Sequence, residues 1–89
     1  MEYNKNGRKV EFTTILEDKE NATIFRHFKG NEYKIICIGK DSNNLNDVVI
    51  YQGEYENHPI WVREIDEFFS SVDHEKYPEV TQKYRFEKL

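Results

Sequence analysis

Through most of the chain, apolar side chains recur at the two-residue spacing that places alternate residues on one face of a β-strand. Four short stretches follow this pattern, at 23–28, 33–38, 48–55 and 60–63, and polar or turn-forming residues separate them. The pattern predicts a mainly β domain of antiparallel strands, in which the last two form a hairpin around a turn at 56–59.

The stretch at 33–38 carries apolar residues on both faces, which is typical of a central, covered strand. Tyr33, Ile35 and Cys37 would share one face, opposite two isoleucines, so we expect Cys37 to be buried. Gly30, in the preceding turn, is free to take a positive φ.

The stretch at 48–55 places alternate residues on one face of a strand, namely Val49, Tyr51, Gly53 and Tyr55. Gly53 would permit a bulge or a bend in this strand.

The spacing changes to a helical one near 64–72, where four apolar residues stand at i, i+3, i+4 and i+7: Ile65, Phe68, Phe69 and Val72. Acidic residues in the first turn favour a helix that begins there. The polar stretch 73–82 contains Pro78 and predicts a loop, and residues 84–86 predict a closing strand.

The first 24 residues read as an N-terminal arm or an extra strand, ahead of a domain over residues 25–89. Asn6-Gly7 is a strong tight-turn pair, and a strand is expected over residues 10–16. Residues 17–21 are charged and polar, which predicts a loop.

Composition narrows the class of protein. A chain of 89 residues fits one domain, and an aromatic content of 15% indicates a folded core built from a few large rings. The net charge of −4 disfavours binding to anionic lipid and to nucleic acid, although it does not exclude nucleic acid. Residues 25–40 nevertheless carry a net charge of +3, against −5 over residues 64–79. A single cysteine and the absence of a long apolar run predict a cytoplasmic protein with no membrane segment.

Several short motifs occur in a family-like order: His27-Phe28-Lys29-Gly30, Val49-Ile50-Tyr51, Trp61-Val62-Arg63 and Arg85-Phe86-Glu87. In this the chain resembles the bacterial family called domain of unknown function 1653, over about residues 25–88. The resemblance implies a small barrel or roll of the Src-homology-three type, with strongly bent strands, and it carries no catalytic residues. Two departures from the family pattern are Glu64, where a proline is usual, and the loop at 43–47.

The sequence gives little indication of a catalytic site or a metal site. The three histidines and Cys37 show no zinc-type spacing, and no glycine-rich phosphate loop is present, so we predict no metal and no cofactor. His27 would have to reach Cys37 from a neighbouring strand to form a nucleophile and base, and a buried cysteine is poorly suited to this role.

An aromatic and basic set is the strongest candidate site. Its ligand-binding candidates are His27, Lys29, Tyr51, Tyr55, Trp61 and Arg63. Aromatic clusters on small β-barrels hold peptides, methylated cations or bases. The alternative for Trp61, and the more expected one, is a place in the core.

We therefore predict a non-enzymatic binding module for a peptide or protein partner, on a scaffold too small for a pocket. Two alternatives stay open. One is an assembly piece that uses the N-terminal arm to pair with a sheet edge of another chain. The other is a small enzyme, or an accessory domain of one, that works with His27 and Cys37 or a carboxylate.

Overall fold

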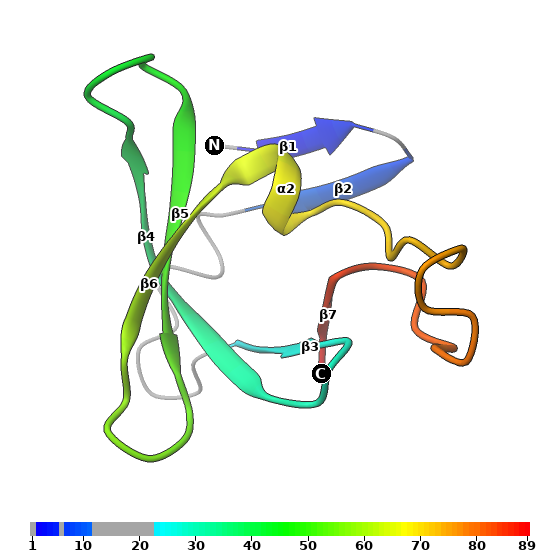
Figure 1. Ribbon diagram of the computed structural model, residues 1–89. Coiled ribbons are helices and arrows are strands. Elements are labelled where there is room, and N and C mark those ends of the chain that lie inside the picture. The colour runs from blue at the N-terminus through cyan, green and yellow to red at the C-terminus, as the bar shows by residue number, and fades with distance from the viewer. Residues whose placement is uncertain (1, 6, 12–22) are drawn as a thin grey trace.

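The computed structural model describes residues 2–5, 7–11 and 23–89, and its elements are seven strands and one short helix within those ranges (Figure 1). Their bounds are β1 Glu2–Lys5, β2 Arg8–Glu11, β3 Ile24–His27, β4 Glu32–Lys40, β5 Asp47–Gly53, β6 Ile60–Glu64, α2 Ile65–Phe68 and β7 Phe86–Lys88. The mainly β class predicted from the two-residue spacing is confirmed.

The main sheet has five antiparallel strands in the order β6-β5-β4-β3-β7, and β1 and β2 form a separate two-stranded sheet. The four strands expected from the sequence are all present, and β5 and β6 pair as the expected hairpin. The described strands do not close into a barrel, because no pairing joins the outer strands β6 and β7. The barrel implied by the family resemblance is therefore replaced by an open, bent sheet (Figure 1).

Aromatic rings fill the inner side of this sheet. Phe68 of α2 stacks on Phe86 of β7, with ring centroids 4.0 Å apart and planes 5° from parallel. Tyr51 of β5 meets both rings edge-on, at 5.1 and 5.4 Å. Phe25 of β3 meets Phe68 in the same manner at 5.8 Å. Because these four rings are almost fully buried, burial of aromatic surface contributes substantially to the stability of the fold.

A β-bulge in β4 reverses the faces of this strand. The register with β5 shifts between Ile35 and Cys37, so that Ile35 lies opposite Tyr51 but Cys37 lies opposite Ile50. Ile35 therefore faces the core, whereas Cys37 faces the outer side of the sheet and is half-buried. The expectation of a buried Cys37 on the same face as Ile35 was wrong, because the extra residue of a bulge inverts the alternation.

The helical spacing at 64–72 identified the buried residues correctly but not the length of the helix. Ile65, Phe68, Phe69 and Val72 are all buried. However, α2 ends at Phe68, and the chain then turns to pair with the C-terminal segment. The carbonyl of Ser70 accepts from the Arg85 amide at 2.9 Å, and the Val72 amide donates to the carbonyl of Lys83 at 2.8 Å. These bonds compete with continuation of the helix, since they use the same backbone groups.

The C-terminal segment differs slightly from its prediction. Residues 73–82 form turns and irregular structure, as expected. Tyr84 makes only an isolated bridge with Ser71, and strand β7 begins at Phe86. Gly30 has a φ of 108°, which confirms the positive φ expected in its turn.

The N-terminal hairpin packs on the core without joining the main sheet. Lys5 and Arg8 form the last pair of the β1–β2 ladder. The expected Asn6-Gly7 turn includes Asn6, which lies outside the described residues. Tyr3 is buried, and its ring lies 4.8 Å from that of Phe69. The strand expected over residues 10–16 falls largely outside the described residues, as does the loop at 17–21.

The two departures from the family pattern lie side by side. The side-chain amides of Asn44 and Asn46 both lie 3.4 Å from a carboxylate oxygen of Glu64. This cluster joins the β4–β5 loop to the end of β6. None of its residues lines the cavity described below.

Candidate functional site

A cavity of about 430 Å³ lies on the inner side of the main sheet. The sheet is open there, because its outer strands β6 and β7 do not pair with each other. β6 contributes Trp61 and Arg63 to its wall, and β7 contributes Phe86. The turn between β3 and β4 and the loop after α2 supply most of the remainder. The full lining comprises His27, Phe28, Lys29, Asn31, Tyr33, Tyr51, Trp61, Arg63, Asp73, Lys76, Tyr77, Arg85 and Phe86. The expectation that the scaffold is too small for a pocket was wrong, because the open sheet leaves this space at its edge.

Five of the six candidates from the sequence meet in this cavity. They are His27, Lys29, Tyr51, Trp61 and Arg63. The sixth, Tyr55, lies at its rim, where its hydroxyl accepts a hydrogen bond from the indole nitrogen of Trp61 at 3.0 Å. The strands β3, β5 and β6 thus bring together residues that are up to 36 positions apart in the sequence.

Trp61 is exposed over 46% of its surface, so the expectation that it belongs to the core was wrong. It lies opposite the buried Tyr51 on the inner face of the β5–β6 pair. However, β6 is an outer strand, and no described strand lies beyond it to cover the indole. Gly53 allows the Tyr55 ring to approach the backbone here, since a Cβ atom at this position would collide with that ring.

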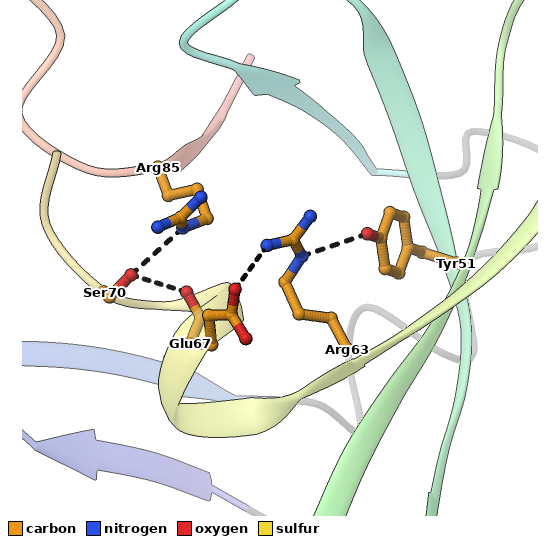
Figure 2. Close-up of polar contacts among 5 residues, drawn as sticks. All are labelled: Tyr51, Arg63, Glu67, Ser70 and Arg85. Atoms are coloured by element: carbon orange, nitrogen blue, oxygen red, sulfur yellow. Dashed lines mark hydrogen bonds and ion pairs between the residues drawn. The ribbon is translucent and has the colours of Figure 1, made fainter. Parts of the chain in front are cut away.

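Arg63 is held in place by two partners, as Figure 2 shows. Its Nε donates to the hydroxyl of Tyr51 at 3.1 Å, and its Nη1 lies 2.7 Å from a carboxylate oxygen of Glu67. The guanidinium also lies over the Phe86 ring, 5.7 Å from its centroid. These contacts fix a charged group at the wall between β6 and β7.

The cavity is cationic although the protein is acidic. Four basic side chains line it and only one carboxylate, that of Asp73. Glu67 compensates Arg63, but no ion pair among the described residues involves Lys29, Lys76 or Arg85. The ammonium groups of Lys29 and Lys76 lie near the Tyr77 ring, at 5.7 and 5.5 Å from its centroid. The cavity therefore offers uncompensated positive charge beside aromatic faces.

The environment of the cavity changes the titration of His27. Burial, together with the charges of Arg63, Arg85 and Lys29, lowers the pKa of His27 to about 4. Its Nδ1 lies 3.1 Å from the amide nitrogen of Lys29 and accepts its hydrogen bond. The neutral ring consequently carries its proton on Nε2, so at neutral pH His27 is a hydrogen-bond donor without a charge.

Tyr33 and Cys37 bear on the chemistry of the site. Burial and a hydrogen bond with Tyr55 raise the pKa of Tyr33 to about 12, so its phenol stays protonated. Cys37 faces the outer side of the sheet, whereas His27 lines the cavity on the inner side, so the two do not meet as a nucleophile and base. Within the described ranges, no group of three or more His, Cys, Asp or Glu side chains is placed to hold a metal ion.

Sequence reasoning missed several lining residues, among them Lys76, Tyr77 and Arg85. Lys76 and Tyr77 stand in a loop within an acidic stretch, where the local sequence suggests a solvated surface. Arg85 was part of the family-like motif Arg85-Phe86-Glu87, and this was the one available signal. Folding of the loop after α2 against the β3–β4 turn brings Tyr77 to Phe28, with ring centroids 4.9 Å apart.

The fold and cavity define a small antiparallel β module with an open, cationic and aromatic recess. The family model described as "Protein of unknown function (DUF1653)" matches residues 23–88, and the chain belongs to this family. No curated protein and no solved structure matches the chain. No helix among the described residues is both long and apolar enough to cross a membrane.

Proposed function

We propose that this protein is a non-enzymatic binding module that takes an acidic segment of a peptide or protein partner into the cavity between β6 and β7. The observation that carries the proposal is the uncompensated positive charge of Lys29, Lys76 and Arg85 in a recess lined by aromatic rings. A carboxylate entering there would gain charge-assisted hydrogen bonds, and its aliphatic stem would gain apolar contact with the rings.

The shape of the site supports a binding role. Phe68, Phe86 and Tyr51 form a packed floor behind the cavity, so the site is anchored on the rigid core. Arg63 is already ordered by Tyr51 and Glu67 before a ligand arrives, which reduces the entropy lost on binding (Figure 2). A recess that is open to solvent suits a side chain of a larger partner better than an enclosed small molecule.

A titration with two peptide pools tests this function. One pool contains short, randomly ordered peptides rich in glutamate, and the matched pool replaces every glutamate by glutamine. Trp61 is the single tryptophan, so its fluorescence reports on the cavity, and amide shifts locate the contact. We expect changes at Trp61 and at the β3–β4 turn with the glutamate pool only.

The combined variant Lys29→Gln and Lys76→Gln should weaken binding about two- to tenfold, the size expected for two partly exposed charges. Lys40→Gln is the matched control, because Lys40 lies on β4 away from the cavity and pairs with Asp47 at 2.7 Å. Equal binding of the two pools, or an equal loss in the control variant, would refute the proposed function.

A further inference from the structure

We infer that the partner segment binds as an added β-strand along the outer edge of β6, with alternate side chains directed into the cavity. This inference rests on the proposed function and specifies how the ligand is held. It is argued from three features of β6: outer backbone groups with which no described strand pairs, exposed apolar side chains on one face, and the cationic cavity on the other face.

The backbone of β6 presents hydrogen-bonding groups to solvent. The amide of Gly53 donates to the carbonyl of Pro59 at 2.9 Å, which sets the alternation of the β5–β6 ladder. In an antiparallel ladder the hydrogen-bonded pairs recur at every second residue. Tyr51 with Trp61 and Val49 with Arg63 are therefore also pairs whose backbone groups bond to each other. The N–H and C=O groups of Ile60 and Val62 consequently point away from β5, and no described strand pairs with them.

The two faces of β6 differ in chemistry. Trp61 and Arg63 stand on the inner face and line the cavity. Ile60 and Val62 stand on the outer face, and they are exposed over 61% and 64% of their surfaces. A strand added to β6 would alternate in the same way, since side chains of paired strands share faces. Its inward residues would meet positive charge, and its outward residues would meet Ile60 and Val62.

The expected occupant is therefore an extended peptide in which acidic and apolar residues alternate. Charge complementarity favours carboxylates at every second position, and the exposed aliphatic surface favours valine or isoleucine between them. A second copy of this chain is a different occupant, and measurement of the solution mass separates the two.

A pair of peptides with equal composition tests the inference on the full chain. In the first, glutamate and valine alternate; in the second, the glutamates form one block and the valines another. We expect the alternating peptide to bind about tenfold more tightly, because only it can satisfy both faces of β6 together with its backbone groups.

Backbone pairing is tested separately on each partner. Val62→Pro removes the outward amide of β6, which proline at an edge strand permits, and Val62→Thr is the matched variant that keeps it. We expect the proline variant to lose the preference for the alternating peptide and the threonine variant to keep it. On the ligand, every second amide is N-methylated, in two peptides that differ in which alternate set is methylated. Methylation of the amides that face β6 should abolish binding, and methylation of the other set should leave binding intact. The ligand arm does not depend on the folding of a variant.

The outcomes are distinct. The inference is supported if the alternating peptide binds more tightly and its binding depends on which alternate set of amides is methylated. Equal binding of both orderings, with no effect of N-methylation, overturns it while leaving the proposed cavity function in place. Failure of every glutamate peptide overturns both. Self-association of the free protein that Val62→Pro abolishes would overturn it in favour of a second copy.

Discussion

The two outer strands of the main sheet differ in length and in how their outer edges are covered. β7 has three residues, and Arg8 of the N-terminal hairpin donates to the carbonyl of Phe86 at its start. β6 has five residues, three of them exposed and apolar, and no described strand pairs with its outer side. Proteins usually blunt edges by short length, charge or coverage, as β7 does. The longer, apolar edge of β6 beside a cationic cavity is the feature on which the proposed strand addition rests.

The two outer strands also differ in how far their aromatic residues belong to the core. Phe86 of β7 is buried and belongs to the ring stack, whereas Trp61 of β6 is half exposed and contacts mainly the rim. Substitutions in β7, or in the residues that contact it, should therefore lower the free energy of unfolding. Substitutions in β6 should instead weaken the proposed binding. Four substitutions test this division, from the largest expected effect to the smallest.

Phe86→Ala should lower the free energy of unfolding by about 3–5 kcal/mol, because it leaves a cavity beneath the rings of Phe68 and Tyr51. Trp61→Ala is the matched aromatic truncation on the other edge, and we expect it to lower that energy by about 1 kcal/mol or less. Urea denaturation of both variants measures the difference. Equal losses would show that the two edges are not distinct in their energetic roles.

Arg8→Ala should destabilise the protein by about 2 kcal/mol, because it removes a charge-assisted hydrogen bond to Phe86 and a stacking contact with Tyr84. Lys9→Ala on the same strand is the control, since Lys9 is exposed and makes only a 3.8 Å pair with Glu2. Chemical denaturation followed by circular dichroism compares the two. A loss in the Lys9 variant as large as that in the Arg8 variant would contradict coverage of β7 by Arg8.

His27 should make stability depend on pH. The unfolded chain takes up a proton on His27 near its ordinary pKa of 6.5, but the folded protein does so only near pH 4. The unfolded state therefore binds more protons in this window, and stability falls as the pH falls from about 6.5 to about 4. With allowance for solvent screening, we expect a loss on the order of 1–2 kcal/mol. The difference in unfolding free energy between wild type and His27→Gln, measured across this range, should shrink accordingly; a constant difference would contradict the prediction.

Gly53→Ala should have the smallest effect, about 1 kcal/mol, because the Tyr55 ring must move away from the new methyl group. The hydrogen bond from Trp61 to Tyr55 would break, and the emission of Trp61 would shift to longer wavelength. Gly30→Ala is a useful comparison: its Cβ would meet no atom within 4 Å, and the positive φ of 108° would strain the turn instead. An unchanged Trp61 emission in Gly53→Ala would indicate that the rim does not depend on this contact.

The sequence predicted the strands, and five of the six candidate residues line one cavity, for identifiable reasons. Val49, Tyr51 and Gly53 share one face of a strand whose other face becomes polar at Gln52 and Glu54, so their inward orientation followed from the two-residue spacing. His27, Lys29 and Arg63 came from motifs on strands and turns whose pairing could be anticipated. By contrast, the bulge beside Ile36 leaves no mark on the apolar pattern, and it reversed the expected orientation of Cys37.

Two other features depend on tertiary contacts that local patterns do not encode. α2 stops at Phe68 because residues from 83 to 85 compete for the backbone groups of residues 70 and 72. Trp61 is exposed because β6 ends the sheet, and strand order is a property of the whole fold. The positive charge of Lys76 in the cavity could not be predicted, since its neighbours in the sequence are acidic.

The orientation of Cys37 has a practical consequence. It is the only thiol, it is half-buried on the side of the sheet opposite the cavity, and the natural sequence already contains it. A maleimide tether at this sulfur would immobilise every molecule in one orientation, with the recess turned toward the solution. The unaltered chain can thus be arrayed on a sensor chip, and candidate ligands in solution can be screened against it without an engineered attachment site.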